Sequence, residues 1–295
     1  MTHLLMLISC VPEPAGTCMD WTQVFLLSLI QGLTEFLPIS SSAHLVLPAQ
    51  LTDWPDQGLA FDVAVHFGTL LAVITYFRQD LIKMLAAFTH APAMLSNLGW
   101  RPTLLQTAAH NEHLDLVIKL ALATLPIVIV GFATKDIIEG NLRTLSVIAT
   151  ATILFAVVLW IADRRPGSRS LASWSDTVWI GLAQTLALVP GTSRSGITIA
   201  VALLVGLNRV AAARFSFLLA IPTIAGAQLL LTLDLMSEGN SVDLAPIAVG
   251  SLIAFTSAYL SIHFFIRLLD RFGMIPYVIY RLVLGSVLFW IVAGA

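Results

Sequence analysis

The sequence predicts an all-α integral membrane protein, an inverted-topology repeat with six full transmembrane helices and two re-entrant helical hairpins. The first observation is composition: 58% of the 295 residues are hydrophobic and 11% are charged, against about 25% charged in soluble domains. The second is a set of apolar segments near the roughly 20 residues that cross a bilayer. The third is a pair of apolar segments that are broken by polar runs at corresponding places in the two halves.

Six segments are long and apolar enough to span a membrane. Those without Asp, Glu, Lys or Arg are residues 145–162, 215–233 and 244–266. Those with polar interruptions are residues 59–77 (Asp62 and His66), 116–134 (Lys119) and 274–292 (Arg281). Asp62 and His66 lie four apart on one helical face, so they either pair with each other or line a site. Arg281 either marks a site or snorkels to the interface.

Two further apolar segments are broken and therefore too short to span. They are residues 21–51, interrupted around Pro38, and residues 177–207, interrupted around Pro190. Broken helices are tolerated within a bilayer only where protein or a water-filled cavity satisfies the freed backbone groups. Each is therefore predicted to be a re-entrant hairpin, with a half-helix in, a polar turn and a half-helix out.

The two broken segments resemble each other, and each is followed by three predicted spans. Aligning Pro38 with Pro190 sets Ser40 against Thr192 and Ser41 against Ser193. This order of elements indicates two repeats, residues 19–162 and residues 163–295, with the site where they meet. Residues 1–18 are predicted to be an extension that precedes the natural start, a lipoprotein-type signal being the less favoured alternative.

Basic residues are distributed unequally over the predicted loops. With the N-terminus outside, the cytoplasmic loops hold Arg78, Lys83, Arg101, Arg164, Arg165, Arg169, Arg209, Arg214, Arg267 and Arg271. The opposite loops hold only Lys135 and Arg143. Because positive charge favours the cytoplasmic side, both termini are predicted to be extracytoplasmic and the halves oppositely inserted. The net charge of −2 indicates no particular partner, and nucleic acid is not expected.

The first polar run combines a carboxylate, hydroxyls and a histidine. Gln31 and Glu35 are four residues apart and so share one helix face. Pro38 then ends or kinks that helix. The next polar side chains are Ser40, Ser41, Ser42 and His44. Each of these residues also has a purely structural interpretation. The serines are equally consistent with helix caps or close helix packing. Glu35 and His44 are equally consistent with hydrogen bonds to neighbouring helices.

The second polar run places Arg194 among small residues, Gly191, Thr192, Ser193, Ser195 and Gly196. A guanidinium in such a turn suits a phosphate, because its planar fork donates to two oxygens at once. Backbone N–H groups at the start of the next half-helix add to such a site. With a carboxylate and serines from the other run, this set predicts phosphoryl transfer or hydrolysis.

At these residues the chain resembles a known family. Residues 31–44 and 190–196 are similar to the two signature motifs of the bacterial undecaprenyl-diphosphate phosphatases of the bacitracin-resistance type, and residues 215–222 and 275–281 match further. The resemblance runs from about Met19 to the C-terminus. It implies a multi-pass enzyme of the bacterial inner membrane, with its site facing the periplasm. It implies removal of the terminal phosphate of undecaprenyl diphosphate, recycling of the lipid carrier for the cell wall, and bacitracin resistance.

The resemblance also implies roles for individual residues. The implied catalytic residues are Glu35, Ser41, His44 and Arg194. The implied substrate-binding residues are Gln31, Ser40, Ser42, Gly191, Thr192, Ser193 and Ser195. One departure matters: where the family often has glutamate, this chain has Gln31, which weakens a scheme with two carboxylates on a divalent cation. Mg²⁺ or Ca²⁺ bridging Glu35 and the diphosphate remains an option.

The expected mechanism has Glu35 accept the proton of Ser41, which attacks the terminal phosphorus, while His44 assists proton transfer or binds the leaving phosphate. Direct attack by water is the alternative that the sequence leaves open. A transporter or flippase for a lipid phosphate is the alternative of a different class, because inverted repeats with half-helices at a midplane site are transporter architecture. The expected partners are a polyprenyl diphosphate and membrane lipids, and a homodimer is one open option for assembly.

Overall fold

The computed structural model describes residues 11–12, 18–52, 54, 56–98, 111–142, 144–237 and 244–294. Within these ranges the regular secondary structure is helical, apart from one short antiparallel pair, β1 (Val11–Pro12) with β2 (Cys18–Met19), and an isolated bridge between Arg169 and Leu207. The proposed extension, residues 1–18, lies largely outside the described residues. The prediction of an all-helical chain is confirmed for the rest of the part that the structure describes.

The six predicted spans are present as helices that are long and apolar enough to cross a membrane. They lie within α4 (Gly58–Tyr76), α7 (Glu112–Asn141), α8 (Leu145–Asp163), α11 (Arg209–Ser237), α12 (Leu244–Phe272) and α13 (Ile275–Gly294). The other helices are α2 (Trp21–Thr34), α3 (Ser41–Leu51), α5 (Arg78–Leu98), α9 (Trp174–Gln184), the 3₁₀ helix η1 (Thr185–Leu188) and α10 (Arg194–Leu204).

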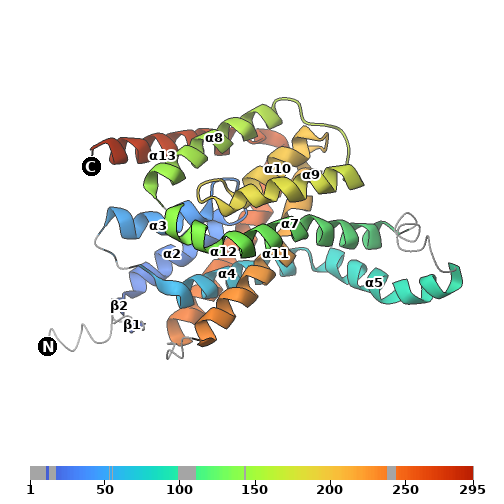
Figure 1. The fold of residues 1–295 in the computed structure, drawn as a ribbon, viewed down its shortest axis with the longest axis horizontal. Helices are drawn as coiled ribbons and strands as arrows, with labels where there is room; N and C mark the ends of the chain where they lie inside the picture. Colours follow the sequence, from blue (N-terminus) through green and yellow to red (C-terminus); the bar gives the residue numbers. More distant parts are fainter. Residues whose placement is uncertain are drawn as a thin grey trace.

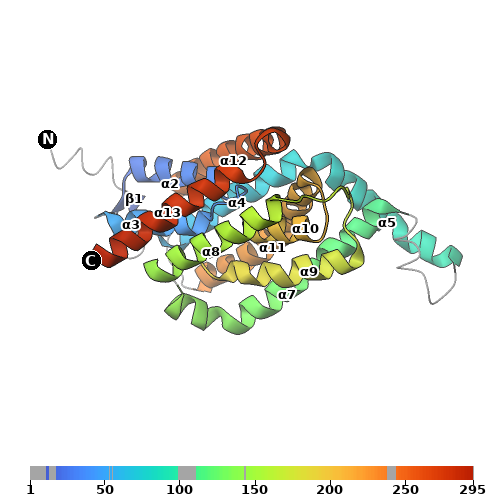
Figure 2. The same cartoon turned by 90° about the horizontal axis from the view of Figure 1, so that it is seen from above.

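The long helices lie alongside one another, and α5 extends from the end of the bundle opposite to the end of α13 (Figures 1 and 2). Helix α12 packs on α2 and α4, while α7 packs on α9 and α11. Small residues allow this close approach. A Cβ added to Gly68 of α4 would lie 2.2 Å from the Ser251 carbonyl oxygen, and one added to Gly181 of α9 would lie 2.7 Å from the Cα of Ala123.

The outward faces of the long helices carry large apolar side chains. Exposed examples on α7 are Leu125, Val128, Ile129 and Phe132, and on α13 Ile279, Val283, Phe289 and Trp290. In water such surfaces would associate, whereas in a bilayer lipid tails cover them. The structure therefore has the surface of a multi-pass membrane protein.

Both polar runs break the helices, as predicted. Helix α2 ends at Thr34 and α3 begins at Ser41, while η1 ends at Leu188 and α10 begins at Arg194. The residue before each outgoing helix has an unusual positive φ: Ser40 has φ 75° and ψ 91°, and Ser193 has φ 70° and ψ 113°.

The geometry of the two turns matches with Ser40 opposite Ser193. In each turn the strained serine lies near the serine two residues further on, with Oγ···Oγ distances of 3.3 Å for Ser40 and Ser42 and 3.2 Å for Ser193 and Ser195. This register differs by one residue from the alignment of the prolines. Ser41 therefore corresponds to Arg194, since each is the first residue of its helix.

Candidate active site

Glu35 lies at the centre of the candidate site, at the C-terminal end of α2. Its side chain is 7% exposed, and both carboxylate oxygens accept hydrogen bonds. Oε2 accepts from the Ser41 hydroxyl at 2.7 Å and from the Gln31 Nε2 at 2.9 Å. Oε1 accepts from the Arg194 Nη2 at 2.7 Å. The two polar runs thus meet at one carboxylate, as the sequence predicted.

Arg194 opens α10 and reaches across to the first half of the chain. Its side chain is 12% exposed, and its Nη1 is buried without a hydrogen-bond partner. An orphaned guanidinium N–H is costly to bury. Because the other Nη already holds Glu35, Nη1 is the donor left for an anionic ligand.

A cavity of about 260 Å³ opens beside this pair. Its polar wall consists of Glu35, Ser40, Ser41, Ser42, His66, Ser193, Arg194, Thr223 and Gln228. Its apolar wall consists of Ile127, Ala187, Ile224, Ala227 and Leu231. A phosphate head with an apolar tail requires a cavity with both kinds of wall. Thr223, Gln228 and the apolar residues were not predicted, since they lie within otherwise unremarkable apolar helices.

Four residues with predicted substrate-binding roles lie off this cavity. Gln31 and Thr192 are fully buried, and Gln31 bonds Glu35 rather than a ligand. The Ser195 hydroxyl donates to the Leu37 carbonyl at 2.9 Å and so ties the second turn to the first. Gly191 has φ +94°, and a Cβ there would lie 2.4 Å from the Ile148 carbonyl oxygen. These residues therefore hold Glu35 and the two turns in place without lining the cavity.

His44 also lies off the cavity. Its Nδ1 donates to the Ser40 carbonyl at 2.7 Å, because a carbonyl oxygen can only accept. Its Nε2 then accepts from the Tyr280 hydroxyl at 2.5 Å, and the two rings are stacked. Both ring nitrogens are therefore occupied, and this arrangement gives no direct support to the proton-transfer role predicted for His44.

His66 is the histidine that lines the cavity. Its Nδ1 donates to the Asp62 carbonyl at 2.7 Å, so the lone pair of the neutral ring is on Nε2. That nitrogen lies 3.9 Å from Glu35 Oε2, and the side chain is 31% exposed. The signal in the sequence was a histidine inside a predicted span, one turn after Asp62.

Arg281 is fully buried, with 0% exposure, and contacts both polar turns. The snorkelling alternative is therefore wrong. Sequence reasoning missed its position because the residues that it contacts lie far away in the chain.

Glu35 has few neighbours among the described residues that could ligate a metal ion. Within the described residues no group of three or more His, Cys, Asp and Glu side chains is placed to hold a metal ion. Glu35 is the single carboxylate among the residues that line the cavity, and Arg194 already neutralises it. Hard cations such as Mg²⁺ and Ca²⁺ need several oxygen ligands, so most of these would have to come from the substrate or water.

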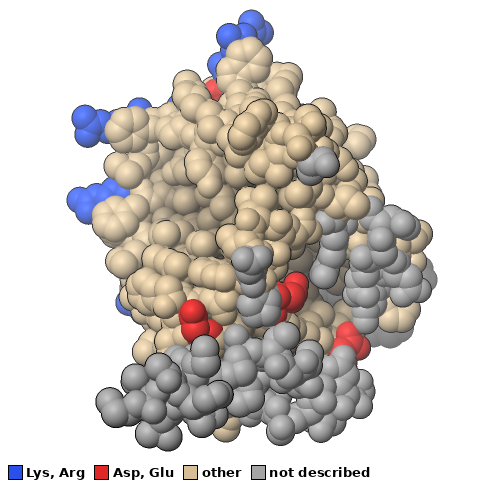
Figure 3. Space-filling model, turned by 90° about the vertical axis from the view of Figure 1, so that its left-hand side faces the viewer, with Lys and Arg blue, Asp and Glu red and all other residues tan. Residues whose placement is uncertain are grey.

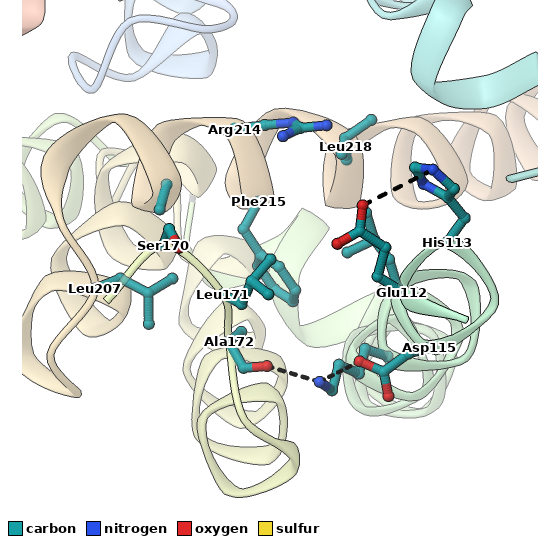
Figure 4. Close-up of a pocket in the computed structure, with 13 residues that line it drawn as sticks. Glu112, His113, Asp115, Ser170, Leu171, Ala172, Leu207, Arg214, Phe215 and Leu218 are labelled. Carbon is teal, nitrogen blue, oxygen red and sulfur yellow. Dashed lines mark hydrogen bonds and ion pairs between the residues drawn. The ribbon is translucent and has the colours of Figure 1, made fainter. Parts of the chain in front are cut away.

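A second, smaller cavity of about 120 Å³ lies between α7, α11 and the segment before α9 (Figure 4). It contains several charges, but they are partnered. Lys119 Nζ donates to Asp115 Oδ2 at 2.5 Å and to the Ala172 carbonyl at 2.7 Å, and Arg214 pairs with Asp80. The Lys119 bond to Ala172 fastens the segment before α9 to α7, and the Arg214 pair joins α11 to α5. We do not take this cavity as the active site.

The family model described as Bacitracin resistance protein BacA matches residues 24–287. A protein from Alcanivorax borkumensis named undecaprenyl-diphosphatase is 52% identical over 277 residues, which cover 92% of this chain and 100% of that protein.

Proposed function

This chain belongs to the bacitracin resistance protein BacA family, and we propose that it hydrolyses undecaprenyl diphosphate to undecaprenyl phosphate and inorganic phosphate. It is an enzyme of the undecaprenyl-diphosphatase kind, like the relative from A. borkumensis. One observation gives the main support for hydrolysis. A serine hydroxyl and an arginine from opposite halves meet on the two oxygens of Glu35, at the wall of a half-apolar cavity.

The proposed reaction begins with the diphosphate beside Arg194, whose free Nη1 donates to the terminal phosphate. Ser41 Oγ forms a bond to the terminal phosphorus and gives its proton to Glu35 Oε2, 2.7 Å away. The bond from phosphorus to the bridging oxygen breaks, and undecaprenyl phosphate leaves with that oxygen and its electron pair. Glu35 acts as the general base, and Arg194 stabilises the charge that builds on phosphorus.

Water completes the proposed cycle. Its oxygen bonds to phosphorus, the bond from phosphorus to Ser41 Oγ breaks, and Ser41 takes its proton back from Glu35. His66 Nε2 accepts the proton of the water and then releases it to solvent, so that phosphate leaves and each group returns to its starting state. His66 suits this step because it lines the cavity, its Nδ1 is bonded to the Asp62 carbonyl, and its Nε2 lies 3.9 Å from Glu35 Oε2. The same groups also serve direct attack by water, in which Glu35 takes the water proton and Ser41 remains unmodified.

We propose that Mg²⁺ or Ca²⁺ arrives bound to the diphosphate rather than residing in the protein. The phosphate oxygens supply the hard ligands that such a cation prefers, and Glu35 is the carboxylate available on the cavity wall. When bound, the cation would neutralise negative charge on the leaving phosphate.

The proposal includes two oppositely inserted repeats whose polar turns are re-entrant hairpins. Two features support it: the matching Ser40 and Ser193 conformations, and the exchange of packing partners, since α12 covers α2 and α4 as α7 covers α9 and α11. Helices α2 and α3 pack together, as do α9 and α10.

We further propose that the protein lies in the bacterial inner membrane with its site open to the periplasm. Figure 3 views the end of the molecule at which α13 ends. Among the residues drawn in colour, most acidic side chains lie in its lower half, and Lys and Arg project from its upper and left margins. This distribution favours the extracytoplasmic side for that end. There the product would be regenerated lipid carrier for cell-wall synthesis, which would counter bacitracin.

The proposed reaction is tested with purified protein in detergent and undecaprenyl diphosphate, measuring inorganic phosphate and undecaprenyl phosphate together. Equal amounts of the two products are expected. Release of pyrophosphate, or of the free alcohol, would contradict attack at the terminal phosphorus.

A further inference from the structure

We propose that Arg281 is a positioning residue, which holds the two polar turns in the one relative arrangement that lets Ser41 and Arg194 reach Glu35 together. The inference rests on the proposed function, because it concerns the groups that perform that reaction. It is independent of which nucleophile, serine or water, attacks the phosphorus.

Arg281 donates only to backbone carbonyls among its described hydrogen-bond partners. Nη1 donates to the Pro38 carbonyl at 3.2 Å and to the Thr192 carbonyl at 2.9 Å. Nη2 donates to the Gly191 carbonyl at 2.9 Å. One nitrogen thus joins the first turn to the second, within a side chain that has no exposed surface.

The same guanidinium also fixes the pair of turns to α8. Nε donates to the Thr152 carbonyl at 3.1 Å, and Nη2 lies 3.5 Å from the Ala151 carbonyl oxygen. A guanidinium has five N–H donors in a rigid plane, so it can hold several carbonyls at fixed angles. A lysine ammonium has three donors on a flexible stem and cannot span the same set.

The bonds to Arg281 fall where the backbone is strained. Ser193 directly follows the Thr192 carbonyl that Arg281 binds, and Ser40 lies two residues after Pro38. Both serines have φ near +70°, a conformation that costs of order 1–3 kcal/mol for a residue other than glycine and persists only when its surroundings enforce it.

Each strained serine immediately precedes a residue of the site. Ser40 precedes Ser41, and Ser193 precedes Arg194, and both of the following side chains end on Glu35 at 2.7 Å. A change at Arg281 would therefore move both groups at once. A displacement of 1 Å in a reacting group lowers a rate by about 100-fold.

The test compares Arg281→Lys and Arg281→Met with the parent, measuring kcat per folded molecule, KM and the midpoint of thermal unfolding in detergent. We expect kcat to fall by about 100-fold in both variants. Lysine should recover much of the unfolding temperature, because it keeps a buried donor and charge, but little of kcat. A purely structural role predicts that kcat per folded molecule stays at the parent value, and that result would overturn the inference.

Arg209→Lys is the matched control. Arg209 Nε binds Asp163 Oδ1 at 2.6 Å, away from both turns, so the same change there should lower the unfolding temperature without lowering kcat. An equal loss of kcat in this variant would overturn a specific role for Arg281. If the parent shows no turnover at all, the proposed function fails first, and the two failures are thereby distinguished.

Gly196→Ala tests the same role of Arg281 if the Arg281 variants do not fold. A Cβ added to Gly196 would lie 3.0 Å from Arg281 Nη1 and 3.1 Å from Ser193 Cβ, close enough to displace the guanidinium slightly from the second turn that it holds. Gly196→Ala should fold and lower kcat by about 10-fold, a smaller displacement than loss of the arginine. An unchanged kcat in folded Gly196→Ala would contradict the inference.

Discussion

Arg194 and Glu35 form a buried ion pair across the two halves of the chain, Nη2 to Oε1 at 2.7 Å, although 159 positions separate them. Their side chains are 12% and 7% exposed. The pair therefore has two functions in the proposed enzyme. It holds the two polar turns together, and it places a general base beside a phosphate-binding group.

The first prediction concerns the stability of this pair. Arg194→Met leaves the Glu35 charge buried without its partner, and removing one member of such a pair costs about 3–5 kcal/mol. The double variant Glu35→Gln with Arg194→Met removes both charges, so we expect it to unfold at a higher temperature than Arg194→Met. Thermal unfolding in detergent measures this, and strictly additive losses would contradict a coupled pair.

The second prediction separates the serines of the first turn. Ser41→Ala removes the hydroxyl that bonds Glu35, and we expect kcat to fall by at least about 1,000-fold. Ser42→Ala is the matched control, because Ser42 also lines the cavity but is not the serine that bonds Glu35. It should lose less than about 10-fold. Similar losses in the two variants would contradict the assignment of Ser41.

The third prediction concerns the histidine of the cavity. His66→Ala removes the acceptor for the water proton, and we expect kcat to fall by about 100-fold. His113→Ala, in the other cavity, should leave turnover unchanged. Full activity of His66→Ala would refute the role given to this ring.

The fourth prediction concerns an ion pair outside the spans, Arg169 with Asp176 at 2.6 Å. Burial opposes the charge of Asp176, but the Arg169 guanidinium and the Ser173 N–H hold the pKa of this carboxyl below its ordinary value. Because the pKa of Asp176 is lower in the folded protein than the value of about 3.9 in the unfolded chain, its charge stabilises the fold at pH values above about 3.9. This stabilisation is lost as pH falls through the folded pKa.

Asp176→Asn should therefore unfold at a lower temperature than the parent at neutral pH, and the difference should shrink as pH falls below about 4. Unfolding temperatures across this range measure the effect. A difference that stays constant into acid would show that the charge of Asp176 does not contribute.

The fifth prediction concerns the cation. If Mg²⁺ arrives with the substrate, calorimetric titration of Mg²⁺ into the protein without lipid should give no saturable heat. Chelation should still lower turnover, and added Mg²⁺ or Ca²⁺ should restore it. Stoichiometric binding to the protein alone would contradict this order of events.

The spans and the breaks in the helices could be predicted from sequence because each depends on local composition. Uninterrupted apolar segments are long enough to cross a bilayer, and the residues around Pro38 and Pro190 cannot continue a helix. From the sequence we could infer that the two turns converge, but not that Arg194 bonds Glu35. Their bond depends on packing between helices that are distant in sequence.

Three features of the site lay beyond local patterns. The ring of His44 turns toward Tyr280, 236 positions away, and no spacing rule predicts this contact. The sequence left Arg281 as either a site residue or an interfacial side chain, because a guanidinium in a span can reach either environment. The pairing of Ser40 with Ser193 depends on backbone angles, whereas the prolines suggested a register one residue away.

Phosphate release from undecaprenyl diphosphate by purified protein, measured for the parent, Glu35→Gln and Arg194→Ala, shows whether the two polar turns form one hydrolytic site. We expect turnover by the parent and its loss in both folded variants. Tight binding that depends on Arg194, without turnover in the presence or absence of Mg²⁺ or Ca²⁺, would contradict this expectation and favour a transporter of lipid phosphates.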